Sequence, residues 1–116
     1  MLIRKLRQLF GAEVRHVRIH PTALIAPSVI LDRVFPQGIH IARGAIVKEG
    51  AVILAHDEVT GRTFNTRICA DAIIGPRAVI MPGVVVGRKS VIMADVIVNE
   101  DVPDRAIVFG NASAVR

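Results

Sequence analysis

The stretch ICADAI-IGPRAV-IMPGVV-VGRKSV-IMADVI-VNEDVP, residues 68–103, repeats a pattern of six residues. The opening residues of the six lines are Ile68, Ile74, Ile80, Val86, Ile92 and Val98. The fifth position of each line holds a small or β-branched residue, which in an extended chain faces the same side as the opening residue of the next line. Between them lie glycine, proline, aspartate, asparagine, arginine and lysine, which are typical of tight corners. Each line is therefore predicted to be one short strand followed by a corner.

Strands and corners at this period predict a parallel β-solenoid, in which three lines make one triangular coil and the stacked coils share a core. A helix is disfavoured, because a spacing of six residues drifts off one helical face. The same frame is present earlier in the chain, and its lines open on Ile19, Ile25, Leu31, Ile41, Val47 and Ile53. Twelve lines predict four coils.

Two insertions interrupt the frame, each after three lines. The first gap is ten residues instead of six and leaves four extra residues around 36–40, and the second is fifteen and leaves nine within about 56–67. Because three lines complete a coil, both insertions should leave the prism at the same edge and lie side by side. Loops on a rigid scaffold commonly carry function, so we expect a site at this edge.

Composition narrows the class of protein. The 116 residues allow one domain, and with four Phe and no Tyr or Trp its core must be built from isoleucine, valine and alanine. The single cysteine, Cys69, excludes an intramolecular disulfide and fits a reducing cytoplasm. No apolar run is long enough to span a membrane, and the N-terminus lacks the apolar region of a signal peptide. The net charge of +5 favours an acidic partner, and an anionic small molecule fits at least as well as nucleic acid, for which aromatic platforms are absent and the charges are dispersed.

Residues 1–16 are predicted to form a short capping helix and a lead-in to the solenoid. Leu2, Leu6, Leu9 and Phe10 share one helical face, and Gly11 would end the helix. Contact of residues 1–10 with an anionic membrane surface is an alternative, because basic residues occupy the other face. The sequence favours the cap.

Segments over residues 17–116 together resemble the hexapeptide-repeat acyltransferases, and most closely the sugar O-acetyltransferases of the maltose and galactoside type. LDRVFPQGIHIA at 31–42 resembles their LDxxFPELIxIG, ILAHD at 53–57 resembles ILTHD, and NEDVP followed by GNASAVR resembles TKDVP and GNPAKVI. The resemblance implies an all-β domain at 17–116 that forms a left-handed parallel β-helix. It also implies a homotrimer with acetyl-CoA as cosubstrate, which O-acetylates a sugar or glycan-precursor hydroxyl.

His56 is the candidate catalytic residue. It lies where the frame breaks, so its side chain is not expected in the core, and it takes the place of the family's catalytic histidine in ILAHD. Acetyl transfer to a hydroxyl needs a general base that works near neutral pH, which suits histidine. Asp32 and Asp57 are candidate acceptor-binding residues, although each could instead be a turn residue. No covalent nucleophile is evident, so direct transfer is expected.

The resemblance places acetyl-CoA along the later coils, between subunits. Ala94 takes the place of a small residue beside the pantetheine arm, and Asn99 that of the family's threonine. Positive charge for the CoA phosphates would come from Arg88, Lys89, Arg105 and Arg116, each of which could instead belong to a solvated face. The chain departs from the family pattern at Met93, Glu100 and Ala114.

Two other classes of function stay open. The departures in the CoA region fit a catalytically silent scaffold. A γ-class carbonic anhydrase, which shares the fold, would need three converging histidines for zinc, and the candidates are His16, His20 and His40. The second histidine of that family's pair would fall at Gly61, so no metal is expected.

Overall fold

The computed structural model describes residues 17–110. The predicted capping helix, His16, Ala114 and Arg116 lie outside these residues. Within them, no helix is long and apolar enough to cross a membrane.

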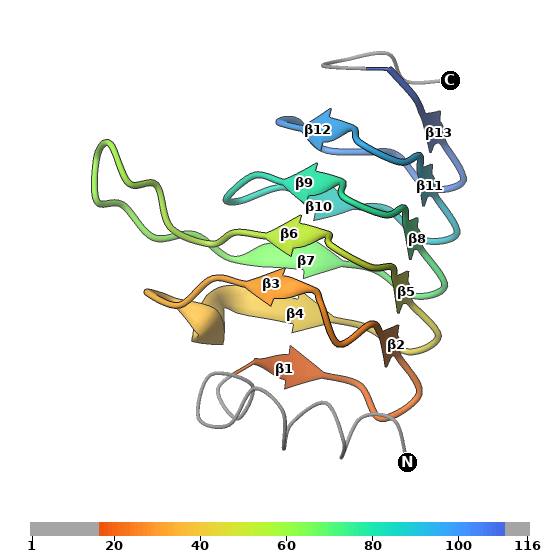
Figure 1. Cartoon of the computed structure of the whole chain (residues 1–116), viewed down its shortest axis with the longest axis horizontal. Helices are drawn as coiled ribbons and strands as arrows, with labels where there is room; N and C mark the ends of the chain where they lie inside the picture. The colour runs from red at the N-terminus through yellow and green to blue at the C-terminus, as the bar shows by residue number, and fades with distance from the viewer. Residues whose placement is uncertain (1–16, 111–116) are drawn as a thin grey trace.

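The described part of the chain contains thirteen strands of two or three residues, which wind upward as stacked turns (Figure 1). In chain order they are β1 (Arg18–Ile19), β2 (Leu24–Ile25), β3 (Ile30–Leu31), β4 (Ile39–Ile41), β5 (Ile46–Val47), β6 (Val52–Ile53), β7 (Thr66–Ile68), β8 (Ile73–Ile74), β9 (Val79–Ile80), β10 (Val85–Val86), β11 (Val91–Ile92), β12 (Ile97–Val98) and β13 (Ile107–Val108). All neighbouring strands pair in parallel, and they form three sheets. Sheet A is β1-β4-β7-β10, sheet B is β2-β5-β8-β11-β13, and sheet C is β3-β6-β9-β12.

The core confirms the six-residue reading. In every strand the last residue is buried, and strands of successive coils keep these residues in register, as with Ile25, Val47 and Ile74 in sheet B. The small fifth-position residues fill the space between them, and Ala23, Ala45 and Ala72 are all fully buried. A thin prism has little room for large side chains, which explains why no aromatic residue of the described range 17–110 is fully buried in the core.

Several corners use a left-handed backbone conformation that is unusual for residues other than glycine. Asp71, Arg77, Lys89, Asp95 and Arg105 have φ angles between 57° and 65°. The N–H of each donates to a carbonyl of the coil before it, as Asp71 does to Arg43. These inter-coil hydrogen bonds offset the conformational cost of about 1–2 kcal/mol at each corner.

The end of the solenoid differs from the expected twelve lines. Val102 follows Val98 by four residues instead of six and forms an isolated bridge with Val86 at the edge of sheet A. The shortened connection leaves room for a bridge but not for a strand. The chain then returns to sheet B as β13, which the prediction of four coils missed.

Both insertions leave the prism between sheet C and sheet A, and both project from the same side (Figure 1). The first contains a short 3-10 helix, η1 (Pro36–Gly38), between β3 and β4. The second is the long loop between β6 and β7. A Cβ added at Gly38 would meet the carbonyl oxygen of Phe64, so the two insertions are in close contact.

Candidate functional site

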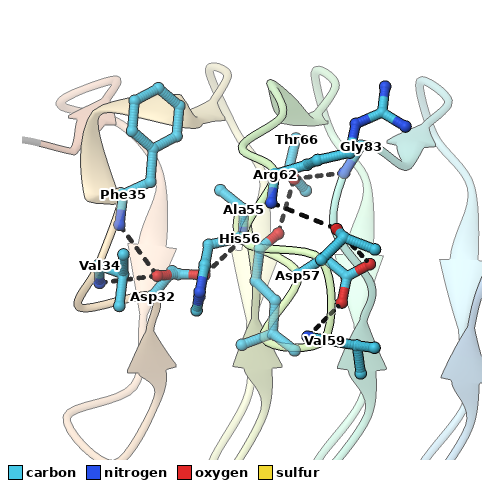
Figure 2. A network of polar contacts seen from close by, with 12 residues as sticks. Asp32, Val34, Phe35, Ala55, His56, Asp57, Val59, Arg62, Thr66 and Gly83 are labelled. Carbon is cyan, nitrogen blue, oxygen red and sulfur yellow. Dashed lines mark hydrogen bonds and ion pairs between the residues drawn. The ribbon is translucent and has the colours of Figure 1, made fainter.

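Asp32 joins the two insertions at their base. Its side chain is only 3% exposed, and its Oδ1 accepts hydrogen bonds from the N–H groups of Val34 at 2.8 Å and Phe35 at 3.0 Å. Its Oδ2 accepts from the N–H of Ala55 in the next coil, at 2.8 Å. Figure 2 shows the carboxylate between these groups, so one side chain fixes both the turn after β3 and the start of the long loop.

This carboxylate is held in its charged form. Burial by itself would raise the pKa of Asp32, but hydrogen bonds from the backbone N–H groups of Ala55, Phe35, Val34 and His56 outweigh burial, and the pKa lies below its ordinary value of 3.8. Hydrogen bonds to an ionised carboxylate favour that form. Asp32 is therefore a buried negative charge at neutral pH.

His56 lies directly against this charge. Its Nδ1 is 4.0 Å from Oδ2 of Asp32, and 16% of its side chain is exposed. Its backbone forms an isolated antiparallel bridge with Thr63, which closes the base of the long loop. This distance is longer than that of a hydrogen bond. In enzymes, contacts between catalytic side chains are often long without a ligand and shorten when the ligand binds. The imidazole thus has a carboxylate nearby and forms part of the lining of a groove.

Thr66 fixes the other end of the loop. This residue is fully buried, and its hydroxyl donates to the carbonyl oxygen of Leu54 at 2.6 Å and accepts from the N–H of Gly83 at 2.9 Å. It therefore ties the strand that leads into His56 to a corner of the following coil (Figure 2). Sequence reasoning did not select Thr66. The available signal was a polar residue at an inward position two residues before Ile68.

Asp57 stabilises the turn at the start of the loop. Its carboxylate accepts from the N–H of Val59 at 2.9 Å and from the hydroxyl of Thr60 at 3.1 Å. The hydrogen bond from Val59 is the largest of the effects that hold the pKa of Asp57 below its usual value. These contacts fit the role of a turn residue, which the sequence left open for Asp57 as the alternative to acceptor binding.

A groove of 720 Å³ runs beside His56. Its walls come from both insertions and from the corners above them, and they include Asp32, Val34, Phe64, Met81 and Asn99. Asn99 had been selected for the cofactor and is thus brought to the same groove as His56 and Asp32. Phe64 forms part of the apolar wall, and the Arg62 guanidinium lies 5.5 Å from its ring centre.

The other cofactor candidates lie at exposed corners. Ala94 and its neighbour Met93 are in the corner between β11 and β12. Arg88 and Lys89 follow β10, and Nε of Arg88 is 3.7 Å from a carboxylate oxygen of Asp104. None of these four residues lines the groove beside His56.

Across residues 17–110, no group of three or more His, Cys, Asp or Glu side chains is arranged to hold a metal ion. Of the three histidines considered for zinc, His16 lies outside the described residues. His20 and His40 both line a hollow on the outer face of sheet A and not the groove beside His56.

The buried charge of Asp32 predicts acid sensitivity. Because its pKa is lower in the folded protein than the unfolded value of 3.8, its contribution to stability is fully present above that pH and is lost as the pH falls through the folded pKa. Asp32→Asn should lower the free energy of unfolding at neutral pH by about 2 kcal/mol and flatten its decline in acid. Urea unfolding across this pH range measures both effects.

Asp95→Asn is the matched control for that experiment, because Asp95 also has a lowered pKa, owing to its hydrogen bond from Arg77, but at an exposed corner. It should change stability far less than Asp32→Asn. Equal effects at the two positions would show that the buried hydrogen bonds of Asp32 have no special weight.

Comparison with known proteins gives consistent results. Residues 65–100 match the family described as bacterial transferase hexapeptide (six repeats). The putative acetyltransferase YvoF of Bacillus subtilis is 35% identical over 85 residues, which are 72% of this chain and 49% of that protein. The chain thus spans about half the length of this relative.

Two solved structures are similar in fold. Maltose O-acetyltransferase from Clostridium difficile superimposes with a TM-score of 0.65 at 17% identity, over 98% of this chain and 81% of the other. Serine acetyltransferase from Neisseria gonorrhoeae gives 0.59 at 26% identity, over 90% of this chain and 43% of the other. The expected fold class, an all-β left-handed parallel β-helix, is confirmed.

Proposed function

Since the chain is a member of the hexapeptide-repeat acyltransferase family, we propose that it transfers an acetyl group from acetyl-CoA to a hydroxyl group of a small acceptor. The observation that carries this proposal is the position of His56 against the buried, ionised Asp32 at the edge of a groove. The imidazole would be the general base, and the carboxylate would orient it and stabilise its charged form.

The chemistry requires no covalent intermediate. His56 accepts the proton of the acceptor hydroxyl as the oxygen attacks the thioester carbonyl, and a C–O bond forms. The tetrahedral intermediate then collapses, the C–S bond breaks, and the proton passes to the sulfur of the departing CoA. Backbone N–H groups near the loop would stabilise the oxyanion during these steps.

A sugar or glycan precursor is the proposed acceptor. The support is segment 31–42, which carries the motif shared with sugar O-acetyltransferases and contributes Asp32 and Val34 to the groove. The groove also combines polar residues with apolar walls, which suits a sugar ring with one polar edge and one apolar face. Asp32 and Asp57 stay the candidates for binding its hydroxyl groups, and acetyl-CoA would bind along the later coils through Ala94, Asn99, Arg88, Lys89 and Arg116.

A homotrimer is the proposed assembly, as the resemblance to the hexapeptide-repeat acyltransferases implies, and the apolar outer faces of two sheets support contact between copies. Sheet B presents an outward row of Leu24, Ile46, Ile73, Val91 and Ile107, kept in register by parallel pairing. Leu24 and Ile107 are each nearly half exposed in a single chain. Packing between copies would cover these side chains. A reducing cytoplasm is the proposed location, supported by the unpaired thiol of Cys69.

Release of free thiol from acetyl-CoA tests the proposed function. The protein should release thiol faster than the uncatalysed background in the presence of a sugar from a panel of mono- and disaccharides, and mass spectrometry should find the O-acetylated sugar. Turnover with L-serine but with no sugar would retain the acetyltransferase and reject the sugar acceptor. Absence of turnover with every hydroxyl acceptor would favour the catalytically silent scaffold.

A further inference from the structure

A second hollow, of 620 Å³, lies on the outer face of sheet A. Residues of β1, β4 and β7 line it, together with the corner residues that follow each strand, such as His20, Ala42 and Cys69. The two insertions precede β4 and β7 and therefore enter sheet A at the N-terminal ends of these strands. The corner residues of the hollow follow the same strands at their C-terminal ends. The hollow is therefore separate from the groove beside His56 and shares no lining residue with it.

A row of basic side chains crosses this hollow. Arg18, His40 and Arg67 are in register on three adjacent strands, and they point outward because the residues that follow them, such as Ile41, are buried. Neighbouring strands are about 4.8 Å apart, so all three side chains can reach a single ligand. The outer faces of sheets B and C carry apolar residues at the equivalent positions, which makes this row a feature of sheet A alone among the described strands.

The positive charge of the row is not neutralised within the described part of the chain. The ion pairs found there involve other side chains, and no carboxylate of residues 17–110 lies within 4.0 Å of a guanidinium nitrogen of Arg18 or Arg67. Arg43, at the rim of the hollow, is paired with Asp71 at 4.0 Å. Arg18 and Arg67 flank His40 from the strands on either side of it, so an anion in the hollow would be attracted by both guanidinium groups.

The pKa of His40, at the centre of the row, lies below its ordinary value. Burial lowers its pKa, the positive charges of Arg67 and Arg18 lower it further, and a side-chain hydrogen bond with Asn65 acts in the opposite direction. His20 also lines the hollow, and its Nδ1 lies 2.9 Å from the hydroxyl of Thr22. An anion placed between the two arginines would reverse their effect on His40 and draw a proton onto it.

We propose that this hollow binds a phosphate group, with Arg18 and Arg67 donating hydrogen bonds to its oxygens and protonated His40 completing the site. Arginine presents donors in a planar fork that matches phosphate geometry. The acetyl transfer proposed above uses none of these three residues, so the site is additional to it. The phosphate would belong either to a soluble phosphorylated molecule or to the headgroup of a lipid.

Sulfate binding to the 116-residue chain, measured by calorimetry, is the first test. The charge of sulfate is constant across neutral pH, so any pH dependence reports on the protein. Affinity should rise as the pH falls from about 8 to about 6, by up to tenfold per pH unit if one proton is taken up. Arg67→Gln should weaken binding about tenfold or more, and His40→Asn should abolish the pH dependence.

Arg77→Gln is the matched control. It also removes one arginine charge, but Arg77 lies at a corner outside the hollow and is paired with Asp95, so sulfate affinity should not change. Equal losses in Arg77→Gln and Arg67→Gln, or absence of sulfate and phosphate binding by the wild type, would overturn the site. Inorganic phosphate in calorimetry and vesicles containing phosphatidylglycerol in sedimentation then separate the two sources. Binding of either probe that depends on Arg67 supports the site.

The role of this site is distinguished from that of the proposed transferase by the Michaelis constant for acetyl-CoA. Arg67→Gln should leave that constant and the turnover of the enzyme unchanged. A large rise in the constant would show that the hollow holds a phosphate of CoA, and would overturn an independent site. Because sulfate binding is measured without acetyl-CoA, its result stands even if the chain proves to have no transferase activity.

Discussion

His56→Ala is expected to lower acetyl transfer by about 10²–10⁴-fold, the usual contribution of a general base. The chain folds around a core to which this side chain does not belong, so the melting temperature should change little. Steady-state thiol release from acetyl-CoA, with the best acceptor of the panel, measures the loss. The Michaelis constant for acetyl-CoA should stay within a few-fold of wild type, because the imidazole acts on the acceptor.

Two further variants make this result specific. Lys48→Ala removes an exposed corner residue between β5 and β6 and should retain full turnover. Asp32→Asn should lower turnover by less than His56→Ala, because the imidazole remains but its charged form loses a carboxylate partner. Full turnover by His56→Ala would remove the general base from the mechanism and leave the family assignment without a catalytic residue.

Gly75→Ala is expected to destabilise the fold strongly. A Cβ at this position would lie 2.6 Å from the carbonyl oxygen of Ile92 and 2.8 Å from the backbone nitrogen of Ala94 in the next coil. Backbone atoms cannot turn aside as a flexible side chain can, so the two coils would have to separate. Overpacking of this kind should lower the free energy of unfolding by about 3 kcal/mol, which chemical denaturation can measure.

Gly61→Ala is the control for this substitution. Gly61 lies in the long loop with a φ of 75°, and a Cβ there would meet nothing within 4 Å. Alanine at this position therefore carries conformational strain without crowding, which should cost about 1 kcal/mol. A smaller loss for Gly75→Ala than for Gly61→Ala would contradict the close approach of the coils.

The regular part of the solenoid was readable from the sequence, because one physical requirement recurs in every line. Each strand must bury its last residue and each corner must admit a tight turn, so Ile74 and its counterparts mark the frame. The position of the insertions followed from the same frame, since a triangular coil needs three lines. Thr66 shows where such reasoning ends, because its partners Leu54 and Gly83 come from different coils and no local pattern pairs them.

The burial of Asp32 and the position of β13 were harder to predict, because both lie where the chain departs from the six-residue repeat. Asp32 follows Leu31 at a position that is normally a corner, and its carboxylate is buried among backbone N–H groups at the base of both insertions. β13 is reached through a connection two residues shorter than the repeat, so the frame that identified the other strands does not extend to Ile107. In both cases the departure from the repeat, and not the repeat, determines the structure.

Calorimetric titration of acetyl-CoA into the wild type and into His56→Ala tests the assignment of this chain as an acetyl-CoA-dependent enzyme most directly. Binding with similar affinity by both proteins, together with turnover only in the wild type, is the expected result. It would place His56 in the chemical step and not in cofactor binding. Absence of binding by the wild type at millimolar acetyl-CoA would contradict the assignment, and Met93 and Glu100 would then mark a site that no longer accepts the cofactor.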